Sequence, residues 1–152
     1  MKKMLKRLNS QEGFTLAELL IVVAIIAVLV AVSIPVFNNQ LEKSRDATSA
    51  ANIRSAYAMA QASYLSEVAS DKTVTVNKTT DGKVGSVVVS GVKFEGVQPG
   101  WSGAITDLPQ GVVWDALGDD ASGALGGQAG NKTLTFTYNN DGTITLSVGT
   151  GS

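Results

Sequence analysis

Histidine and cysteine are both absent from this sequence of 152 residues. The chain therefore has no imidazole acid or base, no thiolate nucleophile and no Cys/His zinc site. Charge is scarce as well, because charged residues make up 16% of the composition, and 12 Lys+Arg nearly balance 13 Asp+Glu. Nucleic-acid-binding proteins show a basic excess, so this balance argues against direct nucleic-acid binding. The hydrophobic content of 44% argues against a disordered chain.

Glycine and proline are almost missing from the first half of the chain. Gly13 is the only glycine before Gly82, and Pro35 is the only proline between residues 14 and 81. These two residue types mark turns and interrupt regular elements. The first half is therefore predicted to be helical, and the glycine-rich remainder to form strands and turns.

A long apolar run follows a short basic segment at the N-terminus. Residues 1–13 contain four basic residues, and residues 16–37 are interrupted only by Glu18, Ser33 and Pro35. A helix of 22 residues spans ~33 Å, which is about the thickness of a bilayer core. Basic residues on the N-terminal side predict that this end stays in the cytoplasm.

Residue chemistry alone leaves three interpretations of this run open. It could be a secretory signal peptide cut after Ala31-Val32-Ser33, although the run is longer than a usual signal core. It could be a plain membrane anchor, which accounts for the length but not for Glu18. It could also be a specialised segment, since an acidic residue in an apolar span is costly and is a candidate for function.

The residues Gly13-Phe14-Thr15-Leu16-Ala17-Glu18-Leu19-Leu20 resemble the processing site of type IV pilins and the related pseudopilins. The resemblance covers about 37 residues, a quarter of the chain. It implies that residues 1–13 are a leader, that a prepilin peptidase cuts between Gly13 and Phe14, and that the same enzyme N-methylates Phe14. Cleavage would remove four of the 12 basic residues and one of the 13 acidic residues, which leaves a side-chain charge of −4.

The resemblance also implies roles in assembly for residues 14–37. Glu18 would pair with the amino group of Phe14 on a neighbouring subunit, which offsets the cost of two isolated buried charges. A plain interfacial position of Glu18 is the alternative. Pro35 would kink the helix, because proline removes a backbone hydrogen bond. The sequence departs from many relatives in having no glycine between Phe14 and Pro35.

Residues 38–68 are polar and rich in alanine, and they are predicted to continue the same helix beyond 50 residues. Apolar residues recur at helical spacing on one face. They are Ile53, Tyr57, Ala60, Tyr64 and Val68. This face needs a sheet to cover it, so the two tyrosines on it are expected to belong to the core.

From residue 69 to residue 152 the pattern predicts a β-rich head. Candidate strands cover 73–77, 83–90, 92–95, 111–114, 133–138 and 143–148. The last two flank Asn139-Asn140-Asp141-Gly142, a strong hairpin signal, so Leu134, Phe136 and Tyr138 should pair with the strand that carries Leu146 and Val148. The predicted class is α+β: a long N-terminal helix packed on a C-terminal antiparallel sheet, as in the pilin fold.

The acidic residues Asp115, Asp119 and Asp120 are weak candidates for calcium ligands, because calcium prefers oxygen ligands. The spacing of an EF-hand is missing, and a solvated turn explains the cluster better than a calcium site does. No phosphate-binding glycine motif, nucleophile elbow or catalytic carboxylate pair is found in the sequence. We therefore expect no cofactor and no enzymatic activity.

The sequence is thus interpreted as a major pilin of a type IV pilus-like surface filament. The implied partners are other copies of the chain, the prepilin peptidase, and the assembly platform with its ATPase acting indirectly. The precursor would cross the cytoplasmic membrane once, with its N-terminus inside, before it joins an extracellular filament. Two alternatives remain: a major pseudopilin of a type II secretion or DNA-uptake system, and a membrane-anchored β-domain binding protein that never polymerises.

Overall fold

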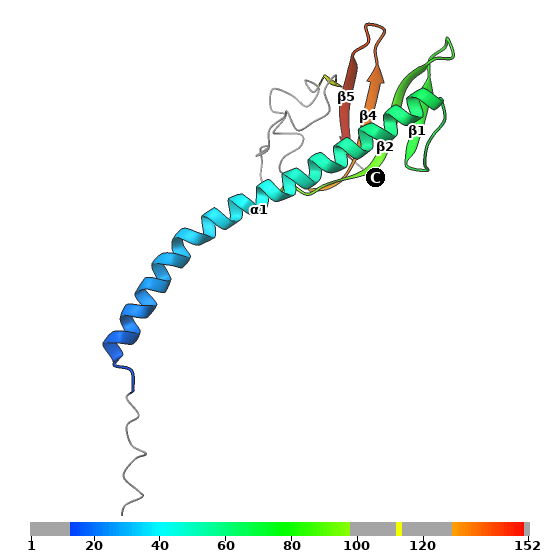
Figure 1. The fold of residues 1–152 in the computed structure, drawn as a ribbon. Helices are drawn as coiled ribbons and strands as arrows, with labels where there is room; N and C mark the ends of the chain where they lie inside the picture. The colour runs from blue at the N-terminus through cyan, green and yellow to red at the C-terminus, as the bar shows by residue number, and fades with distance from the viewer. Residues whose placement is uncertain (1–12, 98–111, 114–128, 151–152) are drawn as a thin grey trace, which may run out of the picture. The chain divides into compact units, whose positions relative to one another are not determined.

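The computed structural model describes residues 13–97, 112–113 and 129–150. This part of the chain contains one long helix followed by five strands (Figure 1). Their bounds are α1 (Leu16–Ser66), β1 (Val74–Lys78), β2 (Val84–Phe94), β3 (Val112–Val113), β4 (Gly130–Tyr138) and β5 (Ile144–Thr150). The chain divides into two compact units, residues 1–38 and residues 39–152. The α+β class predicted from the sequence is confirmed.

The first unit contains the apolar part of α1. Within the described residues, α1 is the one helix that is long and apolar enough to cross a membrane, a test that a signal sequence also passes. The helix continues through Pro35 without interruption. Two residues earlier, the Ser33 hydroxyl donates a hydrogen bond of 2.7 Å to the Leu29 carbonyl, a contact that often accompanies bending. A kink at Pro35 stays a prediction.

The second unit is built around a five-stranded sheet in the order β1-β2-β4-β5-β3. The strands β1, β2, β4 and β5 pair antiparallel, as predicted, and the two-residue β3 adds a parallel pair with β5. The predicted last hairpin is confirmed, since Leu134 pairs with Val148 and Phe136 pairs with Leu146. The calcium candidates Asp115, Asp119 and Asp120 lie outside the described residues.

Two predictions about the elements are wrong in detail. Residues 83–90 and 92–95 were expected to form separate strands, but they form the single strand β2. A register shift between Val89 and Val92 absorbs the break, and Gly91 adopts a left-handed φ of 77° there. Val68 was placed on the apolar helix face, yet α1 ends at Ser66 and the Val68 side chain is exposed.

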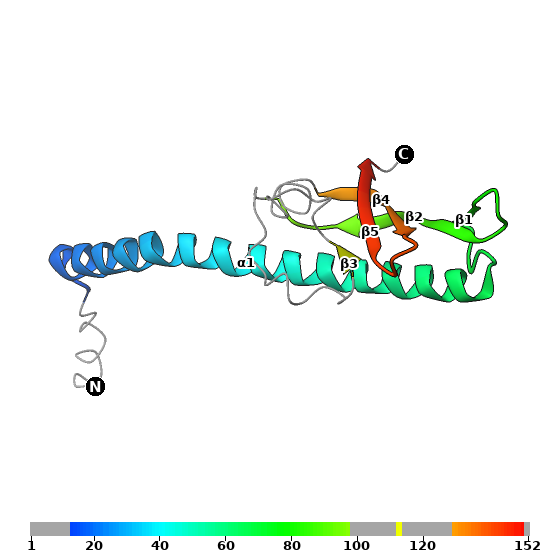
Figure 2. The same cartoon turned by 90° about the horizontal axis from the view of Figure 1, so that it is seen from above.

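The head core forms where the C-terminal part of α1 crosses one face of the sheet (Figure 2). The buried positions of α1 recur every three or four residues, and most of them are small. They include Ser49, Ala50, Ile53, Ala56, Ala60 and Ser63. The small side chains on this face of α1 leave room for the larger side chains of the sheet. Val87, Val89, Leu134, Phe136 and Leu146 are excluded from water there.

Polar side chains of α1 hold the far end of β2 and the residues after it. The Asn52 amide donates to the Lys93 carbonyl at 2.7 Å, and the Ser49 hydroxyl accepts from the Glu95 N–H at 2.8 Å. Two turns earlier, the buried Glu42 carboxylate accepts from the Val97 N–H at 2.6 Å. These contacts satisfy backbone groups beyond the end of β1, where no strand of the described part pairs with β2 on that side.

All three tyrosines of the chain meet between α1 and β4. The Tyr57 ring packs at a tilt on Phe136 with a centroid separation of 5.7 Å, and the Tyr64 ring stacks on Tyr138 at 3.8 Å. The expected core role of Tyr57 and Tyr64 is confirmed. The hydroxyl groups differ: Tyr57 accepts a hydrogen bond from Gln61 at 2.7 Å, whereas the buried Tyr138 hydroxyl has no hydrogen-bond partner among the described residues.

Ionisation of the Tyr138 phenol is expected to lower the stability of the head at alkaline pH. Burial raises the pKa of Tyr138 from 10.0 to about 12, and the neighbouring Tyr57 and Tyr64 add to this shift. Between pH 10 and 12 the unfolded chain would release this proton and the folded chain would keep it, so stability is expected to fall as pH rises through this window. Urea unfolding of the full-length chain in detergent, at pH 7 and pH 11, measures the effect.

Two phenylalanine variants provide the control. Tyr138→Phe should leave stability at pH 7 nearly unchanged, because no hydrogen bond is lost, and should reduce the alkaline loss. Tyr57→Phe should cost about 0.5–1.5 kcal/mol at pH 7, because it removes the bond from Gln61. Equal losses at pH 7 for both variants would contradict this assignment.

Candidate functional site

The start of α1 is held by a reciprocal cap between Thr15 and Glu18. The Thr15 hydroxyl accepts a hydrogen bond from the Glu18 N–H at 3.2 Å. In return, the Glu18 Oε2 atom accepts from both the Thr15 N–H and the Thr15 hydroxyl, each at 2.8 Å. This arrangement is a capping box, in which two otherwise unpaired N–H groups at the helix start are satisfied. Glu18 therefore has a local role before any partner is considered.

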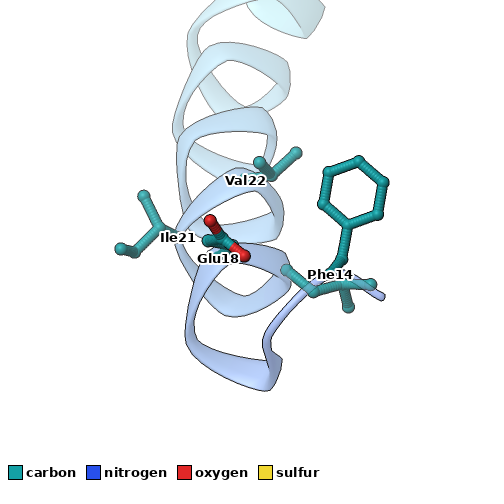
Figure 3. A pocket seen from close by; sticks show the side chains of 5 residues that line it. Phe14, Glu18, Ile21 and Val22 are labelled. Atoms are coloured by element: carbon teal, nitrogen blue, oxygen red, sulfur yellow. The ribbon is translucent and has the colours of Figure 1, made fainter. Parts of the chain in front are cut away.

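Phe14 lies immediately before this cap. It occupies the position that forms a hydrophobic staple with the fourth helical residue, here Leu19. Phe14, Glu18, Leu19, Ile21 and Val22 line an open hollow of about 500 Å³ beside the first turns of α1 (Figure 3). The predicted assembly residues Phe14 and Glu18 are thus neighbours on one short stretch of chain, whereas Pro35 lies further along the same helix.

The apolar part of α1 is not covered by other residues in the described part of the chain. Every large apolar side chain from Phe14 to Phe37 is exposed, with exposed fractions from 47% at Val30 to 86% at Phe14. A helix that is apolar all round is normally buried in protein or in lipid. An uncovered surface of this extent therefore requires a membrane or other helices around it.

Comparisons with known proteins bear on this segment. Residues 8–34 match the family described as the prokaryotic N-terminal methylation motif. Fimbrial protein Q and the type IV major alpha-pilin, both of Moraxella bovis, are each 47% identical to the chain over 38 residues. The N-terminal segment of this chain is therefore similar to that of type IV pilins. The methylation motif includes the residues Gly13, Phe14 and Glu18.

The sequence similarity to these pilins covers only about a quarter of the chain. The matched region covers 25% of this chain and 24% of the length of each Moraxella protein. No solved structure matches the chain. The pilin-like arrangement of a long helix packed on an antiparallel sheet is therefore seen in the structure of this chain itself and not through a related structure.

Thr15 is the site residue whose role the sequence reasoning missed. The pattern Thr15-Leu16-Ala17-Glu18, followed by an apolar run, is the signature of a capping box and could have been recognised. Glu18 can therefore have an intramolecular role in addition to the intermolecular one that the pilin resemblance implies. Elsewhere in the described residues, no three His, Cys, Asp or Glu side chains gather closely enough to hold a metal ion.

Loss of the Thr15 hydroxyl is expected to fray the start of α1. Thr15→Ala removes two of the three cap hydrogen bonds, which should cost about 1 kcal/mol. Amide hydrogen exchange in the first helical turn should then be about fivefold faster in the full chain in detergent. Thr15→Ser keeps the hydroxyl and is the matched control. Equal exchange in the two variants would show that the cap does not hold the helix start.

Proposed function

We propose that this chain is the major structural subunit of a type IV pilus-like filament, cut between Gly13 and Phe14 and assembled through residues 14–37. One observation carries the proposal. The match to the methylation motif coincides with the N-terminal part of α1, residues 16–37. Its large apolar side chains are all exposed, and its single acidic residue, Glu18, lies about one turn from the cleavage position. Membrane insertion explains the helix before assembly, and packing against identical helices explains it afterwards.

The local structure is suited to cleavage at Gly13. Gly13 and Phe14 are exposed and precede the helix, so their backbone is not held in helical hydrogen bonds. The absence of a side chain at Gly13 lets a protease approach the peptide closely. Thr15 and Glu18 both remain in the product, so cleavage leaves the capping box intact and creates a new amino group at Phe14.

The new amino group supplies the charge that Glu18 can pair with. Such α-amino groups titrate near ~8 and are cationic at neutral pH. Both bonds from Thr15 reach Oε2 of Glu18, and no bond to Oε1 is seen in the described structure. In a bundle of apolar helices, Oε1 would accept from the Phe14 amine of a neighbouring copy. The pair would fix the axial register of helices that are otherwise uniformly apolar.

Filament growth follows from the symmetry of such a contact. Glu18 of one subunit and Phe14 of the next form a heterologous contact, and heterologous contacts that do not close into a ring build open helices. The apolar helices would then lie in the filament centre, and the heads would face solvent. Processing would require the prepilin peptidase, and extraction from the membrane would require an assembly platform driven by an ATPase.

A pseudopilin of a secretion or DNA-uptake system is the second candidate, because the same motif precedes both kinds of subunit. Deletion of this gene, with electron microscopy of the cell surface, separates the two. Loss of long surface filaments, restored by the wild-type gene, supports the pilus. Filaments that persist, together with loss of protein secretion or DNA uptake, favour the pseudopilin. Unchanged filaments, secretion and uptake would favour a membrane-anchored binding protein.

A further inference from the structure

Two hairpin turns at the same end of the sheet share one backbone geometry. Residues 79–83 join β1 to β2, and residues 139–143 join β4 to β5. Because Ser86 near the start of β2 pairs with Thr137 near the end of β4, both turns lie at the same end of the sheet (Figure 1). In each turn the first N–H donates to the fifth carbonyl, at 2.7 and 2.9 Å. In each, the glycine N–H also donates to the first carbonyl, at 2.9 and 3.1 Å.

Both turns place an aspartate directly before a left-handed glycine. The pairs are Asp81-Gly82 and Asp141-Gly142, and the glycine φ angles are 78° and 84°. Asp–Gly sequences can rearrange without an enzyme, because glycine offers no side chain to hinder its backbone nitrogen. The two turns are therefore a matched pair in which the backbone is the same and only the side chains around the aspartate differ.

The difference is the residue that follows the glycine. In the second turn, Asp141 Oδ1 accepts from the Thr143 N–H at 2.9 Å and from the Thr143 hydroxyl at 2.6 Å. The Asn139 amide in turn donates to the Thr143 hydroxyl at 3.0 Å. In the first turn the equivalent position is Lys83, and the exposed Asp81 carboxylate makes no hydrogen bond in the described structure.

From this contrast we infer that Asp81 is a site of spontaneous isoaspartate formation, and that Thr143 protects Asp141 from the same reaction. The Gly82 nitrogen attacks the Asp81 side-chain carbonyl carbon, a C–N bond forms, and the side-chain hydroxyl leaves with the amide proton as water. Water then opens the five-membered imide at the original backbone carbonyl. The product has the same mass as the starting chain, and its backbone runs through the former side chain.

The contacts of Thr143 oppose this reaction in two ways. They tie the Asp141 carboxylate to Thr143, so that hydrogen bonds to a charged group must break before the carboxyl group can turn toward the Gly142 nitrogen. They also lower the pKa of Asp141, which keeps the group as a carboxylate, a poorer electrophile than the acid. Both glycine N–H groups are hydrogen-bonded alike, so turn opening does not distinguish the sites.

The consequence for the head is local. Isomerisation inserts one backbone atom at Asp81, which lengthens the turn and removes the geometry that lets Gly82 donate to Thr79. The turn lies at an exposed tip, so the core beneath it stays packed. An extracellular protein is not replaced by new synthesis in place, and Asp81 would therefore record the age of each subunit.

Incubation of the full-length chain in detergent at neutral pH and 37 °C tests the inference. Peptide mass spectrometry with electron-transfer fragmentation distinguishes isoaspartate from aspartate at each position. We expect isoaspartate at Asp81 to accumulate about tenfold faster than at Asp141, the ratio that about 1.4 kcal/mol produces. Equal rates at the two sites, or a faster rate at Asp141, would overturn the inference.

Substitution of the residue after each glycine tests whether that residue, and not the surrounding sequence, sets the rate of isoaspartate formation. Lys83→Thr should give Asp81 the two hydrogen bonds that Asp141 has and slow its reaction, and Thr143→Val should speed the reaction at Asp141 toward the Asp81 rate. The urea-unfolded chain is the reference, in which both sites should react at similar rates. A tenfold difference that persists in urea would show that the turn structure is not its cause.

Discussion

Replacement of Glu18 by alanine is expected to abolish incorporation of the chain into filaments. The variant should still be cut after Gly13, because the leader and the cleavage position are unchanged. In the assembled bundle, however, each Phe14 amine would be buried without its partner, which costs about 3–5 kcal/mol per contact. Repeated at every subunit, this cost should leave no detectable variant in sheared filaments, while processed chain accumulates in the membrane fraction.

Glu18→Gln separates the charge from the helix cap. The glutamine carbonyl can still accept from Thr15, as the Glu18 Oε2 atom does, so the start of α1 should remain capped. The negative charge is lost, and filaments should fail as they do with alanine. Assembly of the glutamine variant at wild-type level would mean that Glu18 acts only through the cap. Normal filaments from the alanine variant would exclude both roles in assembly.

Replacement of Phe136 by alanine is expected to destabilise the head strongly. The Phe136 side chain is fully buried and packs against Tyr57 of α1, so that it links the helix to the middle of the sheet. Deletion of a buried phenylalanine ring costs about 3–5 kcal/mol, a large share of the 5–15 kcal/mol that stabilise a typical domain. Urea unfolding of the full-length chain in detergent should show this loss in the midpoint of the head transition.

Thr137→Ala is the matched control on the same strand. Thr137 follows Phe136, but its side chain is exposed on the opposite face of the sheet. Its replacement should change stability by no more than about 1 kcal/mol. If Phe136→Ala cost no more than Thr137→Ala, the head would not depend on the packing of α1 against β4. Other contacts would then have to hold α1 on the sheet.

The features that were predictable from sequence depend on local pattern. The start of the helix, the apolar run and the last hairpin each have a signal within about ten residues, such as the alternation of Leu134, Phe136 and Tyr138 before an Asp–Gly turn. The bulge that joins the two halves of β2 was missed, because Gly91 within an apolar run looks like a break between strands. β2 pairs with β4 on both sides of the bulge, and only this pairing shows that the two halves form one strand.

Contacts between distant segments were the least predictable. Tyr57, Tyr64 and Tyr138 look scattered in the sequence, and the register of α1 on the sheet brings them together. The ends of elements were also uncertain, since Val68 continues the helical spacing although α1 stops at Ser66. At the candidate site, Thr15 and Glu18 are three residues apart, so the cap between them is a local signal that the sequence does contain.

The N-terminus of the chain in sheared surface filaments tests the central claim most directly. Filaments should be detached from native cells, and the first residue of this chain should be identified by mass spectrometry. The proposal predicts a chain that begins at N-methylated Phe14, which would establish processing and export into a filament together. A chain that stays in the membrane fraction and begins at Met1 would indicate a plain anchor. A chain that begins at Ile34 would indicate a signal peptide and contradict the filament assignment.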